Sequence, residues 1–219
     1  MCGRFSLQAI SQVLANRFHV DCDLNLKPRY NISPTQEIPI ITSETPNKII
    51  LARWGLIPSW SKDGKPGFSM INAKAETINE KPAWKRPFET RRCLIPADGF
   101  YEWKALPTGK QPYRIILKDE SIFAFAGLYD IWNSPDGNQT VSCTIITTVP
   151  NTLMQPIHDR MPAILSRTNE QDWLRTQPAS THLTLLKPYP AHEMHAYPIS
   201  TLVNTPKNDT KEIIAPINS

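Results

Sequence analysis

Prolines are spread along the whole chain, and they limit which folds it can adopt. There are 21 of them in 219 residues, about twice the usual frequency, and they never gather into a low-complexity tract. Proline ends or bends helices and is confined to the edges of sheets, so long helices and helical bundles are disfavoured. Forty per cent of the residues are apolar and 20% are charged, which is typical of a chain with a folded core. The sequence therefore predicts irregular loops between short strands.

Hydrophobic spacing predicts an early helix followed by short strands. Apolar residues recur every three or four positions through 7–18, so we expect a helix from a cap at Ser6 to about His19. Short strands are expected at 38–42 and 49–54. A loop is then expected before the segment at 70–74, and it contains Trp60, Gly64, Pro66 and Gly67.

The centre of the chain predicts β-structure. A short helix is expected within 80–92, interrupted by Pro82 and Pro87. Thr168 and Gln171 resemble a capping box that opens a helix carrying Trp173 and Leu174. The β segments are rich in branched and aromatic residues and are expected at Cys93–Trp103, Tyr113–Lys118, Ile122–Trp132 and Val141–Thr148. We expect one α+β domain over residues 1–219, with an antiparallel or mixed sheet core and short flanking helices.

Several classes of protein do not fit the sequence. No apolar run approaches the ~18 residues of a membrane-spanning helix, and the segment 1–5 lacks a signal-peptide core. The net charge of +4 permits a nucleic-acid partner without requiring one. The four cysteines, Cys2, Cys22, Cys93 and Cys143, include no CxxC pair, so no metal site is expected. We expect a cytoplasmic monomer with no membrane contact, no cofactor and no obligate protein partner.

Cys2 has a chemistry that no internal cysteine shares. Methionine aminopeptidases trim Met before a small residue, so the mature chain is expected to begin at Cys2. Its α-amine, with a pKa of about 7.7–8.0, would then lie beside a thiol with a pKa of about 8.5. Such an aminothiol forms a Schiff base with an aldehyde, and the thiol closes on it to give a thiazolidine. The alternative is that Cys2 is only a small residue near a terminus.

Three further residues are candidates for a site, although each alone is a weak signal. Glu102 shares one face of an expected strand with Phe100, so it is either solvated at an edge or buried with a raised pKa. His158 lies in a turn flanked by prolines, where it is either a proton shuttle or a hydrogen-bonded turn residue. Asn72 follows two apolar residues, and burial would require partners for its amide.

Ordered motifs along the chain resemble the SRAP family, the abasic-site processing proteins. They are Met1-Cys2-Gly3-Arg4-Phe5, Arg29-Tyr30-Asn31-Ile32-Ser33-Pro34, Trp54-Gly55-Leu56-Ile57-Pro58, Ile71-Asn72-Ala73-Lys74-Ala75-Glu76-Thr77, Asp98-Gly99-Phe100-Tyr101-Glu102-Trp103, Ile157-His158-Asp159-Arg160-Met161-Pro162 and Val203-Asn204. The resemblance implies a single α+β domain with a DNA-binding cleft. It also implies a protein that recognises abasic sites in single-stranded DNA and crosslinks to them by lyase-like Schiff-base chemistry, with peptidase-type processing of its N-terminus.

The resemblance assigns roles to the candidate residues. It makes Cys2 the nucleophile, Asn72 a sensor of the lesion, Glu102 an assistant in Schiff-base chemistry and His158 a proton shuttle. Family members commonly carry Arg where this chain has Lys74, which changes a bidentate phosphate contact into a point charge. The DNA contacts implied in this way are Arg4, Pro34, Trp60, Lys74, Thr147 and Arg160.

Two other functions remain open from the residues. One is a cysteine hydrolase in which Cys2 and His158 form a nucleophile–base pair. The other is a non-catalytic module that binds modified or single-stranded DNA, in which Cys2 is incidental. A hydrolase does not need its nucleophile at the first position of the mature chain, and a binding module does not need Glu102 and His158.

Overall fold

The computed structural model describes residues 2–64 and 70–217, so the expected loop residues Pro66 and Gly67 lie outside it. The strands are β1 Phe5–Leu7, β2 Arg29–Ile32, β3 Glu37–Thr42, β4 Ile49–Trp54, β5 Asn72–Lys74, β6 Arg92–Ala97, β7 Gly99–Leu106, β8 Gly109–Leu117, β9 Phe123–Asn133, β10 Gln139–Thr148, β11 Met161–Pro162, β12 Ile164–Leu165 and β13 Met194–Pro198. The α-helices are α1 Ser11–Phe18, α2 Pro82–Thr90, α3 Arg167–Leu174 and α4 Ala179–Leu185. Short 3-10 helices are η1 Ala75–Thr77, η2 Ala191–Glu193, η3 Thr201–Asn204 and η4 Lys211–Ile214.

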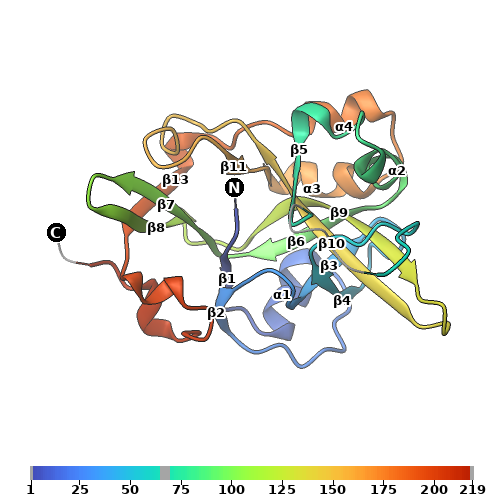
Figure 1. Ribbon diagram of the computed structural model, residues 1–219, viewed down its shortest axis with the longest axis horizontal. Coiled ribbons are helices and arrows are strands. Elements are labelled where there is room, and N and C mark those ends of the chain that lie inside the picture. The colour runs from blue at the N-terminus through green and yellow to red at the C-terminus, as the bar shows by residue number, and fades with distance from the viewer. Residues whose placement is uncertain (1, 65–69, 218–219) are drawn as a thin grey trace.

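The larger sheet closes on itself. Strands β10, β4, β3, β6 and β9 follow one another by hydrogen bonding, and β9 pairs with β10 again, which completes a barrel (Figure 1). β10 runs parallel to β4 and β5, and the other pairings in this sheet are antiparallel. The expected α+β fold with a mixed sheet core is therefore confirmed. The short strands β5, β11 and β12 extend the barrel wall at its rim.

A second sheet has the order β13-β8-β7-β1-β2 and is antiparallel throughout. β1 lies between β7 and β2, and its Phe5 pairs with Phe100 of β7. The Phe5 ring also packs edge-on against Trp54 and Phe125 of the barrel, with centroids 5.2 and 5.7 Å apart. The segment that carries Cys2 is thus fixed to both sheets, and Figure 1 shows it running from β1 toward the middle of the molecule.

The first helix begins later than the sequence predicts. Ser6 lies in β1, where its hydroxyl donates to the Asp98 carboxylate at 2.6 Å, so it caps no helix. Pairing of β1 with β7 satisfies the backbone there, and this overrides the local capping signal. α1 begins at Ser11, and its apolar residues Leu14 and Phe18 are buried as their spacing predicts.

Two other helix predictions need correction. α2 is continuous rather than interrupted. Pro82 lies in the first turn, where a backbone N–H would have no hydrogen-bond partner within the helix, so proline costs no bond there. Pro87 lies inside the helix and is buried, as are Trp84 and Phe88. Thr168 and Gln171 do not form a capping box, since α3 starts at Arg167 and no side chain caps it. Trp173 and Leu174 nevertheless lie on a helix, α3, as predicted, and both are buried.

The predicted strands lie within a few residues of those observed. The one clear difference is that Cys93–Trp103 forms two strands, β6 and β7, which separate at Asp98. Among the described residues, no helix is long and apolar enough to cross a bilayer.

Candidate active site

Cys2 is buried at the start of the segment that leads into β1. Beyond the Phe5–Phe100 pair, the Tyr101 amide donates to the Arg4 carbonyl at 3.0 Å, and continuing this register places Gly3 opposite Glu102. The Cys2 thiol lies 3.8 Å from the Arg4 carbonyl oxygen and has no exposed surface. Burial, and secondarily the negative charge of Glu102, raise the pKa of the thiol well above its usual value. The sulfur is therefore held as a neutral thiol next to a carboxyl group.

Glu102 is buried, which decides between the two alternatives left open by the sequence. It lies on β7, and its side chain shares a face with the fully buried Phe100. Burial raises the pKa of Glu102 to about 7, and the carboxylate of Asp159 acts in the same direction. At neutral pH the side chain is therefore divided between its two protonation states, as suits a group that exchanges protons.

His158 lies at the end of the turn between β10 and β11 and points its Nε2 toward Glu102 Oε2, 3.9 Å away. Its Nδ1 accepts a hydrogen bond from the Arg160 amide at 3.0 Å, so the proton of the neutral ring resides on Nε2, facing Glu102. Asp159 Oδ1 lies 2.9 Å from the same Nδ1, but that carboxylate is largely exposed. A hydrogen bond between these two atoms would require a proton on Nδ1, because a carboxylate can only accept. Burial lowers the pKa of His158, which agrees with the neutral ring.

Asn72 begins β5 at the rim of the barrel. Its Nδ2 donates to the Ile145 carbonyl at 3.4 Å, whereas its buried Oδ1 has no hydrogen-bond partner among the described residues. A buried acceptor without a hydrogen-bond partner is uncommon in folded proteins. At a ligand-binding site, such an acceptor receives its hydrogen bond from the ligand. Lys74, two residues along the same strand, shares this face and is exposed.

Arg160 is largely occupied by protein partners. Both oxygens of Glu76 accept from its guanidinium, at 2.7 and 2.8 Å, and the Thr147 carbonyl accepts at 2.7 Å. Thr147 itself is buried at the end of β10, between β5 and β11. The structure thus brings together three of the residues implied as DNA contacts, Lys74, Thr147 and Arg160, but it leaves only Lys74 as an exposed cation.

Arg4 is also held by the protein. Its guanidinium donates to Asn31 Oδ1 and to the Val203 carbonyl, each at 2.8 Å, and to the Asn204 carbonyl at 3.1 Å. The fully buried Asn31 amide donates in turn to carbonyls of the same C-terminal segment, on Val203, Thr205 and Asn208. These contacts fix the backbone two residues beyond Cys2. Asn31 lies in one of the motifs but was not among the candidate residues, because a single amide beside Arg29 and Tyr30 gives no signal of burial.

Pro34 and Trp60 lie in turns. Trp60 is 68% exposed, which rules out a place at the edge of the core and leaves its ring available to a partner. Pro34 is half-buried and precedes Thr35, whose φ of 75° is rare for a β-branched residue.

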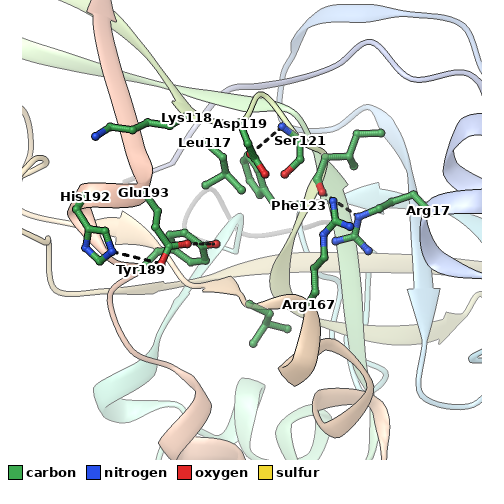
Figure 2. A pocket seen from close by; sticks show the side chains of 12 residues that line it. Arg17, Leu117, Lys118, Asp119, Ser121, Phe123, Arg167, Tyr189, His192 and Glu193 are labelled. Atoms are coloured by element: carbon green, nitrogen blue, oxygen red, sulfur yellow. Dashed lines mark hydrogen bonds and ion pairs between the residues drawn. The ribbon is translucent and has the colours of Figure 1, made fainter.

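A separate pocket of about 450 Å³ is lined by none of these candidate residues (Figure 2). It lies between α1, the β8–β9 connection, the start of α3 and residues 189–193. Figure 2 shows Arg17 and Arg167 entering it from one side, with Tyr189 and Glu193 on the other. Arg17 is paired with Glu170 at 2.7 Å, and the Tyr189 hydroxyl donates to Glu193 at 3.1 Å.

The chain is similar over nearly its whole length to known proteins. The chain is 50% identical over 221 aligned residues to the abasic site processing protein YoqW of Bacillus subtilis, covering 98% of this chain and 99% of that protein. It is 48% identical to the abasic site processing protein YoaM of the same organism, covering 98% and 97%. A crystal structure of a protein from Bacteroides thetaiotaomicron superposes with a TM-score of 0.91 at 32% identity, covering 99% of this chain and all of that one.

The family model described as SOS response associated peptidase (SRAP) matches residues 1–206, which include every candidate residue considered above. Together with relatives of this identity over nearly full length, that match means that the chain belongs to the SRAP family.

Proposed function

We propose that this protein senses abasic sites in single-stranded DNA and links to them covalently through Cys2 after removal of Met1. The relatives that it resembles over nearly their whole length are named abasic site processing proteins. The observation that carries the proposal is the buried Cys2 thiol beside Glu102, whose pKa is raised to about 7 and which faces the Nε2–H of His158. We further propose that residues 1–219 act as one domain and a monomer, on DNA inside the cell.

The proposed reaction has two bond-forming steps. The free α-amine of Cys2 attacks the aldehyde carbon of the ring-opened abasic sugar, and loss of one water gives an imine. The thiol sulfur then adds to the imine carbon while its proton passes to the nitrogen, which closes a thiazolidine. Glu102 accepts and returns protons during carbinolamine formation and dehydration, and His158 exchanges them with Glu102. The result is a stable crosslink that covers the lesion.

The remaining residues fit roles in binding. The orphaned Oδ1 of Asn72 is available to a hydroxyl of the opened sugar, and Lys74 on the same face supplies a phosphate contact. Trp60 offers an exposed ring on which a base can stack, and such stacking is worth about 1–3 kcal/mol. Arg4 and Arg160 serve chiefly to hold the N-terminal segment and the His158 turn, with their outer edges toward the DNA.

The electrostatics of the site disfavour a Cys–His hydrolase. Such an enzyme lowers the pKa of its thiol by pairing it with an imidazolium. Here burial and Glu102 raise the pKa of Cys2, and burial lowers the pKa of His158. The imidazole faces a carboxyl group at 3.9 Å rather than forming an ion pair with a thiolate.

Two variants of the mature chain test the aminothiol mechanism. Acetylation of the Cys2 amine keeps the thiol but removes the lone pair needed for the imine, whereas Cys2→Ala keeps the amine but prevents ring closure. Neither should give a heat-stable adduct with abasic single-stranded DNA, and only Cys2→Ala should give an adduct trapped by borohydride. Intact mass spectrometry reads both. A heat-stable adduct from the acetylated protein would refute the thiazolidine.

A further inference from the structure

Glu76 lies outside the proposed reaction but is connected to it through a short series of contacts. It belongs to η1, which directly follows β5 and so lies four residues beyond Asn72. Its two carboxylate oxygens accept from the two terminal nitrogens of Arg160, at 2.7 and 2.8 Å. The Arg160 side chain is 12% exposed and that of Glu76 is 44% exposed, so the pair is partly shielded from water. Bidentate pairs of this kind fix orientation as well as charge.

The same arginine fixes the backbone beside His158. Its Nη2 donates to the Thr147 carbonyl at 2.7 Å, which ties the guanidinium to the end of β10. With the guanidinium held by both Glu76 and Thr147, the backbone amide of Arg160 is aimed at His158 Nδ1, 3.0 Å away. This bond requires a lone pair on Nδ1 and therefore places the ring proton on Nε2, opposite Glu102.

We propose that Glu76 is a positioning residue for proton transfer: by orienting Arg160 it holds His158 in the Nε2–H tautomer that faces Glu102. The inference rests on the proposed function, since it concerns how that site moves protons. Glu76 touches neither the reacting atoms nor His158, and it acts only through Arg160. Loss of its carboxylate frees one end of the guanidinium, so the backbone at 159–160 can rotate and the Nδ1 bond weakens.

The other charged groups around His158 do not replace this restraint. Glu102 on β7 faces Nε2, and Lys110 on β8 acts only through its distant charge. Asp159 lies next to Nδ1 and favours a proton there, which is the opposite tautomer. When the Arg160 amide no longer holds Nδ1, Asp159 is therefore expected to draw the proton away from the Glu102 side.

The test compares Glu76→Ala with the conservative Glu76→Asp and with the control Glu80→Gln, an exposed acid four residues along the chain. Nitrogen-15 NMR of histidine-labelled protein reports the tautomer directly. We expect the His158 signals of Glu76→Ala to move toward a mixture of tautomers, partial recovery in Glu76→Asp, and no change in Glu80→Gln. Thermal unfolding of the same samples identifies any general loss of structure.

Kinetics supply the second readout. General acid–base assistance is worth about 10²–10⁴-fold, and Glu76 acts on it only indirectly, so we expect crosslinking by Glu76→Ala to slow by about tenfold with a displaced pH profile. Binding to DNA that carries a non-reactive abasic analogue should stay within about twofold. An unchanged tautomer and pH profile would overturn the proposal, as would tighter DNA binding alone, which would mean that Glu76 shields Arg160. If the wild-type protein forms no crosslink, the proposed function fails, and the NMR result still decides the positioning role.

Discussion

Two buried acids, Asp98 and Glu102, lie four residues apart at β7, and the protein treats them in opposite ways. The Asp98 carboxylate accepts hydrogen bonds from the Ser6 hydroxyl and the Gln8 amide and pairs with Arg114 at 3.1 Å. Glu102 is more deeply buried, and its neighbour on the far side is a neutral imidazole at 3.9 Å. Its pKa is raised to about 7.

The difference distinguishes a structural charge, on Asp98, from the acid for which we propose a role in proton transfer, Glu102. Asp98 binds β1 to β7 with a full set of donors, and Gly99 leaves room for Arg114, whose Nε would lie 2.9 Å from a Cβ at that position. Burial of Glu102 destabilises its charged form, which raises its pKa, so the side chain binds a proton more readily than a solvated glutamate does. The start of β7 thus fixes the N-terminal segment through Asp98, and the middle of the strand carries Glu102, the proposed proton acceptor.

The largest expected effect concerns Glu102→Gln, which keeps the shape of the side chain but removes its titration. Crosslinking should slow by about 10²–10⁴-fold, the usual contribution of general acid–base assistance. The wild-type rate should fall as the pH drops below about 7 and Glu102 becomes protonated, whereas the variant should lack this inflection. Denaturing gels over a pH series measure both, with the exposed Glu89→Gln as the control. If Glu102→Gln crosslinks at the wild-type rate, Glu102 has no role in proton transfer.

The next effect concerns Asp98→Ala, which leaves the buried Arg114 without the carboxylate of its ion pair. Removing one member of a buried ion pair costs about 3–5 kcal/mol, so the midpoint of urea unfolding should fall sharply. The exposed Glu80→Ala, which removes an acid from the surface, should unfold as the wild type does. Replacing both members, as in Asp98→Ala with Arg114→Met, should recover part of the loss. A neutral Asp98→Ala would show that this cluster does not hold β1.

The smallest effect is a gain in stability in Glu102→Gln. Because the folded pKa of about 7 lies above the 4.5 of an unperturbed glutamate, the folded wild type binds a proton more tightly than the unfolded chain. Its stability therefore falls as the pH rises from about 4.5 to 7, and the glutamine variant escapes that loss. We expect the variant to be more stable by about 1–3 kcal/mol at pH 8 and equal to the wild type at pH 4. Urea unfolding at both pH values checks this. Equal stability of the two proteins at pH 8 would contradict a raised pKa of Glu102 in the folded state.

The fold followed from the sequence where local signals and burial agree. Branched and aromatic runs predicted the central strands, and α1 buries Leu14 and Phe18 as their spacing requires. Ser6 and Thr168 were misread as caps, because their hydroxyls have other partners, Asp98 in one case and Ser166 in the other. Such competition depends on contacts between distant segments, which a local pattern does not contain.

The candidate site was predictable only in part. Cys2, Glu102 and His158 stood out by chemical type, but their proximity depends on the register of β1 on β7 and on the turn after β10. Glu76, Asn31 and Asp98 gave no separate signal, because an acid or an amide is usually solvated. Each has a partner far away in the chain, at 84 positions for Glu76, 177 for Asn31 and 92 for Asp98.

The C-terminal segment that holds Arg4 has a consequence for the order in which the protein matures. The carbonyls of Val203 and Asn204 that bind Arg4 are 199 and 200 positions away from it, and Figure 1 shows this segment lying beside β2. A ribosome makes the N-terminal residues first, so the nascent chain exposes Cys2 long before these acceptors exist. The Arg4 side chain, two residues beyond Cys2, therefore finds these acceptors only after residues 203 and 204 have been made. A chain that stops before residue 203 would carry Cys2 without the contacts that hold the neighbouring Arg4.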